Sequence, residues 1–198
     1  MRRSRPCTSA SACCVVGEPV ELRTGRLRLS APVEADVDAI HRICQDELIQ
    51  RYTTVPSPYR REDAESFVRL VAEWWDAGSE CVWALRDAEG LVGMVGLHRI
   101  KDGAAELGYW LAPEARGRGY MAEATRAVVD FAFGPMRLER LEWHAVVGNT
   151  GSARVAQSLG FQLEGVRRSG LAGHGARMDG WIAGLLATDP RIPQAWSV

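Results

Sequence analysis

Residues 116–121, Arg-Gly-Arg-Gly-Tyr-Met, have the residue types that a phosphate-binding turn requires. Glycine lets the backbone approach a ligand with no Cβ in the way. Backbone N–H groups at the start of a helix carry partial positive charge, and arginine side chains add full charges that suit a pyrophosphate. The segment therefore predicts a phosphate site, provided that a strand leads into it and a helix follows it.

The flanking residues predict that arrangement. Apolar side chains alternate over residues 105–111, as in a half-buried strand. Met121, Ala124, Val128 and Phe131 recur at the spacing of a helix face. The turn has neither the G-x-G-x-x-G dinucleotide fingerprint nor the Gly-Lys-Ser/Thr ending of a P-loop, so neither site is indicated. Taken alone, the turn is equally compatible with an ordinary loop that exposes two arginines.

A second strand and helix follow downstream. Asn149 or Thr150 can cap a short helix, whose inner face carries Val155 and Leu159 and which ends at Gly160. Four alternating apolar residues predict the buried face of the strand before it: Leu141, Trp143, Ala145 and Val147.

The order of these parts resembles the second half of a GNAT acetyltransferase domain: strand, phosphate turn, helix, strand, Asn149-x-x-Ser152, helix and Leu-Gly-Phe. Within that family, the pattern is most similar to the RimJ/RimL-like branch of N-terminal protein acetyltransferases, which residues 107–111 and 161–165 also fit. Residues 22–29 resemble the first strand of that branch. The resemblance spans about residues 20–187.

The resemblance implies an α/β (α+β) GNAT fold, with a mixed, mostly antiparallel twisted sheet of about seven strands, splayed near its middle and flanked by about four helices. The domain is expected over residues 20–187, between an N-terminal extension (1–19) and a C-terminal tail (188–198). The extension reads as a disordered segment, with a signal peptide as the alternative because three arginines precede a short apolar stretch.

By resemblance, the first half of the chain supplies the acceptor side of the site. A helix opened by Pro32 is expected to bury Val33, Val37, Ile40 and Cys44. Residues 51–59 are expected to form a loop. A helix over residues 61–75 is expected to bury Ala64, Phe67, Val71 and Trp74, and residues 81–85 and 91–100 are expected to form a hairpin turned near residues 87–90.

By resemblance the cosubstrate is acetyl-CoA, with its pyrophosphate on residues 116–121 and no metal required. The backbone N–H near Leu111 would bind the thioester carbonyl. Asn149 would contact the pantetheine arm, although capping a helix would explain it as well. The residues expected to bind the cosubstrate are Trp110, Leu111, Arg116, Gly117, Arg118, Gly119, Tyr120, Met121 and Asn149.

Acetyl transfer to an amine needs a base, a donor to the developing oxyanion and a proton for the departing thiolate. By resemblance Glu106 is the base; the alternative is an exposed strand glutamate beside Arg99 or Lys101. Ser152 would supply the proton or orient the amine, unless it serves only local hydrogen bonding in the first helical turn. Many relatives carry a tyrosine four positions later, where this chain has Ala156.

The expected activity is direct transfer of acetyl to a primary amine, first of all a protein N-terminal α-amine. A small amine, such as an aminoglycoside, a polyamine or an amino-acid derivative, is the alternative and predicts an acidic acceptor groove. A CoA-binding domain without turnover and a nucleotide-binding module remain further alternatives. Because no carboxylate follows Glu164-Gly165 over residues 167–171, a ribosomal-protein substrate is less strongly indicated.

Composition and charge limit the kinds of partner that the protein is expected to bind. The 198 residues are 46% hydrophobic, enough for a full core, and 24 basic against 25 acidic residues give a net charge of −1, which argues against nucleic acid. No apolar run is long enough for a membrane helix. The five cysteines form no C-x-x-C pair, which favours a cytoplasmic protein with reduced thiols. A homodimer is compatible with the family that the chain resembles.

Overall fold

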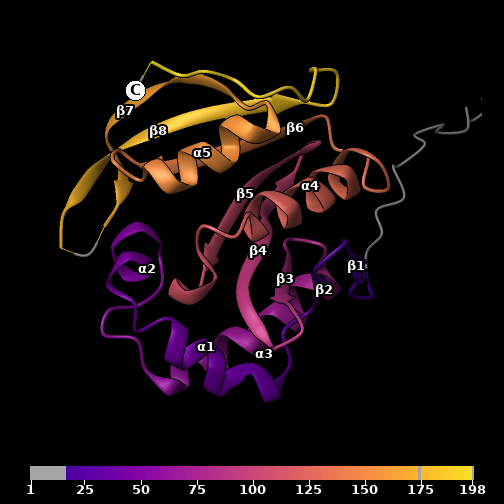
Figure 1. The fold of residues 1–198 in the computed structure, drawn as a ribbon, viewed down its shortest axis with the longest axis vertical. Coiled ribbons are helices and arrows are strands. Elements are labelled where there is room, and N and C mark those ends of the chain that lie inside the picture. The colour runs from indigo at the N-terminus through magenta and orange to yellow at the C-terminus, as the bar shows by residue number, and fades with distance from the viewer. Residues whose placement is uncertain (1–16, 174, 198) are drawn as a thin grey trace, which may run out of the picture.

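One eight-stranded sheet forms the centre of the computed structural model, which describes residues 17–173 and 175–197 (Figure 1). The strand order is β1-β2-β3-β4-β5-β6-β8-β7, and all neighbours are antiparallel except the parallel pair β5 and β6. The strands are β1 (Leu22–Arg23), β2 (Arg28–Ser30), β3 (Cys81–Arg86), β4 (Leu91–Lys101), β5 (Ala104–Leu111), β6 (Arg140–Val146), β7 (Gln162–Ala172) and β8 (Arg177–Leu186).

Five α-helices pack around the sheet within the described residues. Helix α1 contacts α3, α3 contacts β3, α4 contacts β4 and β5, and α5 contacts α4 and β6. Figure 1 shows α1, α2 and α3 together at the lower end of the molecule, with α5 in front of the strands at the upper end. The helices are α1 (Val37–Ile43), α2 (Glu47–Tyr52), α3 (Arg61–Ala77), α4 (Tyr120–Phe133) and α5 (Thr150–Leu159), with 3₁₀ turns at Glu34–Asp36 and Pro113–Ala115.

The mixed, mostly antiparallel α/β architecture predicted from the sequence is therefore confirmed, with eight strands where about seven were expected and five helices where about four were expected. Helix α5 begins and ends as predicted. The Asn149 side chain accepts a hydrogen bond from Ser152 N at 3.2 Å, and Gly160 ends the helix with φ of 95°. The hairpin of β3 and β4, turned at residues 87–90, is also confirmed.

Three details of the first half were wrong. The single strand expected over residues 22–29 is two strands, because Thr24 N donates to Leu27 O at 2.9 Å and closes a turn between them. Val33 is 53% exposed, since a 3₁₀ turn separates it from α1 and takes it out of the helical phase. Residues 51 and 52 belong to α2, so the predicted loop starts at Thr53.

Two further side chains lie elsewhere than expected. Trp75, not Trp74, is the fully buried tryptophan of α3, and its Nε1 donates to Val82 O at 3.2 Å. Val147 is 41% exposed because β6 ends at Val146 and the chain turns at Gly148.

The two predicted terminal segments differ in what the structure describes. Residues 1–16 of the expected extension lie outside the described residues. The C-terminal segment packs on the domain: Trp196 Nε1 donates to Phe161 O at 3.0 Å, and its ring centroid lies 5.4 Å from that of Trp143. Trp196 therefore supports Trp143 on β6.

Candidate active site

Strands β5 and β6 separate in the middle of the sheet. They pair only through residues 104–106 and 140–142, although β5 continues to Leu111 and β6 to Val146. The predicted splay is thus present, and it begins immediately after Glu106. A cavity of about 980 Å³ lies there, and among its lining residues are Glu106, Trp110, Asn149 and Ser152.

The backbone of β5 presents donors to this splay. Ala112 N donates to Val92 O at 2.8 Å, and residues 93–98 of β4 continue in register with residues 111–106 of β5. Hydrogen-bonding direction alternates along an antiparallel ladder, so the N–H groups of Tyr109 and Leu111 point away from β4 and towards β6. Since β6 no longer pairs with this part of β5, both N–H groups are available to a ligand in the splay.

Glu106 projects a buried oxygen into the same region. Its Oε2 atom is buried and lies 3.1 Å from His144 Nδ1. Arg99 on β4 also forms an ion pair with this oxygen, so the contact with Arg99 that the sequence suggested is present. The carboxylate therefore has two basic neighbours, and its place on the cavity lining lets it accept a further hydrogen bond from a ligand.

Ser152 is part of a hydrogen-bonded chain that the sequence did not indicate. The Ser152 hydroxyl donates to the Tyr109 hydroxyl at 3.1 Å, and Tyr109 donates to the Ser152 carbonyl at 3.0 Å. Trp143 Nε1 donates to Ser152 Oγ at 3.1 Å. These hydrogen bonds join α5 to β5 and β6, so they cross the splay. Tyr109 lies on the side of β5 that the alternating pattern predicts to be apolar, so nothing in the sequence indicated a polar role for its hydroxyl.

The predicted phosphate turn has the required local structure. Gly117 and Gly119 have φ of 74° and 76°, values that favour glycine, and Gly119 is the N-cap of α4. No side chain caps that helix end, so its first N–H groups remain available to an anion. An added Cβ at Gly117 would meet no atom within 4 Å, so the turn is open at that point. These features fit a pyrophosphate.

The two arginines of the turn have partners within the protein. Arg116 pairs with Asp46 at 2.6 Å, and Arg118 lies 3.9 Å from Asp87. Although partial burial raises the pKa of Asp46, the Arg116 hydrogen bond and the N–H groups at the start of α2 lower it further, so the net shift is downward. Arg116 therefore links the start of α2 to the turn, and Asp46 partly neutralises its charge.

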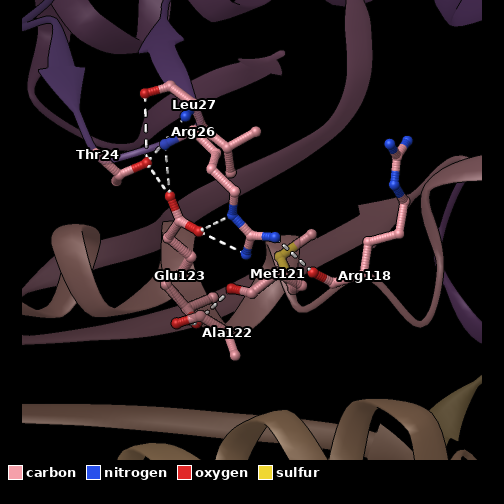
Figure 2. A network of polar contacts seen from close by, with 8 residues as sticks. Thr24, Arg26, Leu27, Arg118, Met121, Ala122 and Glu123 are labelled. Carbon is pink, nitrogen blue, oxygen red and sulfur yellow. Dashed lines mark hydrogen bonds and ion pairs between the residues drawn. The ribbon is translucent and has the colours of Figure 1, made fainter.

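A third arginine, missed in the sequence, reaches the turn from the loop between β1 and β2. Figure 2 shows Arg26 between Glu123 of α4 and the backbone of Arg118. Its guanidinium donates to Arg118 O at 2.9 Å and to Glu123 at 2.7 Å, and it lies 4.8 Å from the centre of the Tyr120 ring. Only the fold brings it here, since about 90 residues separate Arg26 from the turn.

Two predicted cosubstrate residues can act only through their backbones. Tyr120 and Met121 are 6% and 5% exposed, with side chains in the core beneath α4. Residues 116–121 and Leu111 do not line the cavity that holds Glu106 and Ser152. The phosphate turn and the cavity are thus two regions, and β5 connects them.

The described cysteines are not placed for chemistry. Cys44 and Cys81 are buried outside the cavity, and burial raises the pKa of each thiol to about 12. Within residues 17–173 and 175–197, no three His, Cys, Asp or Glu side chains are grouped to hold a metal ion. None of the helices in this part of the chain is long and apolar enough to cross a membrane.

Comparisons with known proteins all find acetyltransferases. The acetyltransferase (GNAT) domain family matches residues 26–162. The ribosomal-protein-serine acetyltransferase of Escherichia coli is 34% identical over 144 residues, which are 70% of this chain and 80% of that protein. The spermidine N(1)-acetyltransferase of Vibrio cholerae is 26% identical over 143 residues, 71% of this chain and 81% of that protein.

Solved structures share the fold. A Salmonella typhimurium acetyltransferase, described as modifying the N-terminal serine of ribosomal protein L7/L12, superposes with a TM-score of 0.74. Its sequence is 22% identical, and the match covers 82% of this chain and 96% of that one. At this identity, the likeness establishes the architecture and not the acceptor.

Proposed function

This chain belongs to the GNAT family of acetyltransferases and is an acetyl-CoA-dependent N-acetyltransferase; we propose that its acceptor is the N-terminal α-amine of a protein or peptide. One observation supports amine transfer at this site above the others. The Glu106 carboxylate lines the cavity, and it lies on the strand that presents the N–H groups of Tyr109 and Leu111 to the splay.

Acetyl-CoA supplies an acetyl group on a thioester, whose thiolate can leave. In the proposed site, the first N–H groups of α4 and the turn at Gly117 and Gly119 bind its pyrophosphate. The Leu111 N–H donates to the carbonyl oxygen as that oxygen gains negative charge. Glu106 accepts a hydrogen bond from the acceptor ammonium, and the Ser152–Tyr109 chain returns a proton to the thiolate sulfur. The ammonium loses a proton to a base on the cavity lining, the electron pair left on its nitrogen forms the C–N bond, and the C–S bond breaks.

The charge of the cavity favours a peptide over a polyamine. Four arginines line it (Arg51, Arg99, Arg167 and Arg177), against three carboxylates (Asp63, Glu80 and Glu106). A polycation such as spermidine would meet more positive than negative side chains. The small-amine alternative called for an acidic groove, and the lining does not have that character. The relatives described as acetylating ribosomal proteins also support a protein acceptor.

Release of free thiol from acetyl-CoA tests this proposal with three acceptors. These are a peptide that begins with serine and contains lysine, the same peptide with a blocked N-terminus, and spermidine. We expect turnover with the first alone, and mass spectrometry should place the acetyl group on the α-nitrogen. Turnover with the blocked peptide would indicate a lysine ε-amine, and turnover with spermidine alone would indicate a small-amine enzyme; either result would contradict the proposal.

A further inference from the structure

The ring of His98 packs against two glycines on the lining of the cavity. Gly96 on β4 and Gly108 on β5 face each other directly in the sheet. A Cβ added to Gly108 would come within 3.0 Å of His98 Cδ2 and 3.1 Å of Nε2, and one added to Gly96 within 2.7 Å of Nε2. Any larger residue at either position would displace the ring. The paired glycines thus form a seat for the imidazole.

Glu80 holds the ring in one orientation. Its Oε2 atom lies 2.5 Å from His98 Nδ1, and both residues line the cavity. A carboxylate at this distance accepts the Nδ1 proton, which leaves Nε2 as the nitrogen with a free lone pair. A fixed imidazole that lines a cavity and keeps one nitrogen free to accept a proton is the arrangement that a general base requires.

The seat lies beside the reacting groups of the proposed mechanism. His98 faces Glu106 across β4 and β5, while its ring leans along the strand to Gly108. Gly108 lies one residue before Tyr109, whose N–H points into the splay. The imidazole therefore lies on the cavity lining, near the Glu106 carboxylate and the strand end that would bind the thioester.

We propose that His98 is a second catalytic residue of acetyl transfer and takes the proton that the acceptor ammonium must lose before it attacks. This inference rests on the proposed function. Glu106 holds the ammonium through one N–H, and a second N–H gives its proton to His98 Nε2. The electron pair left on nitrogen forms the C–N bond, the C–S bond breaks, and the imidazolium, stabilised by Glu80, later returns its proton to water.

Other ionisable groups lie near His98 and Glu106. They are Glu80 before β3, Arg99 on β4, Glu106 on β5, Glu142 and His144 on β6, and Arg167 on β7. His144 is the second imidazole of the cavity, but it lies between Glu106 and Glu142, and no glycine seat fixes it. The test must therefore separate His98 from its neighbours by more than a change in rate.

The first experiment compares wild type with His98→Asn over pH. An α-ammonium group has a pKa of about 7.7–8.0, so it needs a base at neutral pH and is already deprotonated at high pH. We expect kcat/KM for the peptide to fall about 10²-fold near neutral pH. The loss should shrink below tenfold about two pH units above the amine pKa, with acetyl-CoA affinity unchanged by calorimetry. His41→Asn, in α1 outside the cavity, is the matched control and should keep full activity.

The second experiment uses the glycine seat. Gly108→Ala should lower kcat by displacing the ring, yet it should have less than a twofold effect in a His98→Ala background. Added imidazole should restore part of the activity of His98→Ala. A loss from His98→Asn that is constant over pH, or a Gly108→Ala effect of equal size in both backgrounds, would show that His98 only supports the structure and would overturn the proposal.

The outcomes also separate this inference from the function on which it rests. If the wild type releases no thiol with any amine acceptor, the proposed function fails and with it the inference. If the wild type acetylates the peptide and His98→Asn keeps the full rate at neutral pH, the function stands and His98 is not the proton acceptor.

Discussion

The Ser152 hydroxyl donates a hydrogen bond to the Tyr109 hydroxyl over 3.1 Å, and Tyr109 donates back to the Ser152 carbonyl over 3.0 Å. Burial raises the pKa of Tyr109 above its usual range, so the phenol stays protonated. Position 156 on α5, where many relatives carry a tyrosine, is alanine in this chain. The fold instead brings Tyr109 of β5 to Ser152. The two hydroxyls therefore form a unit that can hold and deliver a proton.

We expect Ser152→Ala and Tyr109→Phe each to lower kcat, on the order of 10²-fold, because either change breaks the proton path to the thiolate. The double variant should be no slower than the slower single variant, since groups that act as a unit are not additive. Steady-state thiol release measures this, with calorimetry to check acetyl-CoA binding. Losses that multiply would mean that the two hydroxyls act separately.

Gly119→Asp should abolish acetyl-CoA binding. It would place a carboxylate at the N-cap of α4, where the proposed pyrophosphate site needs positive charge. Gly103→Asp is a matched control, because Gly103 has the same φ of 76° but lies in the turn between β4 and β5. Calorimetric titration of both folded variants decides; retained affinity in Gly119→Asp would remove the phosphate assignment.

Peptides with acidic residues after the N-terminus should be better acceptors than otherwise identical peptides with lysines. Exposed ion pairs contribute about 0.2–1 kcal/mol, so each pair formed with the cavity arginines should raise kcat/KM by up to about fivefold. Arg167→Glu should reverse the preference, whereas Arg168→Glu, the next residue on β7 and outside the cavity lining, should leave it unchanged. A preference that is insensitive to Arg167→Glu would contradict this prediction.

His144 should make the protein less stable in mild acid. Burial lowers the pKa of His144, and the arginines nearby add to this against the opposing effect of Glu142. An unfolded imidazole has a pKa of about 6.5, so below that pH the unfolded chain binds more protons than the folded one. Stability is then complete above about pH 6.5 and falls as the pH drops towards the lower folded value.

The measurement is Tm as a function of pH for wild type and His144→Gln. The variant has no imidazole to protonate on unfolding, so its Tm should fall less than that of wild type across this acid range. Equal slopes for the two proteins would show that the environment of His144 does not penalise its charge.

Local signals in the sequence were sufficient to predict the elements that we propose to bind the cosubstrate. Asn149 caps α5 and Gly160 ends it, because a side-chain acceptor and a residue free to adopt positive φ are local requirements. Gly119 begins α4 for a similar reason. Two of the failed predictions, at Val33 and Val147, concern ends of elements, where a turn shifts the phase of burial by a residue or two.

The register between β4 and β5 could not be predicted from local signals in the sequence. Lys101 faces Ala104 across a turn of two residues with positive φ, and that register would place His98 opposite the buried Leu107. The structure instead has an irregularity between His98 and Lys101, where Ile100 N donates to Ser79 O at 2.9 Å. One extra residue shifts the pairing, so His98 faces Glu106 and shares its side of the sheet.

The sequence by itself determined the family and, in the second half of the chain, the order of strand, glycine-rich turn, helix, strand and helix, because these depend on spacing along the chain. Only the tertiary structure decided which side chains meet: Tyr109 with Ser152, Arg26 with the phosphate turn, and His98 with Glu80. Those contacts depend on sheet register and on where β5 and β6 part, and both are set by packing between segments far apart in the chain.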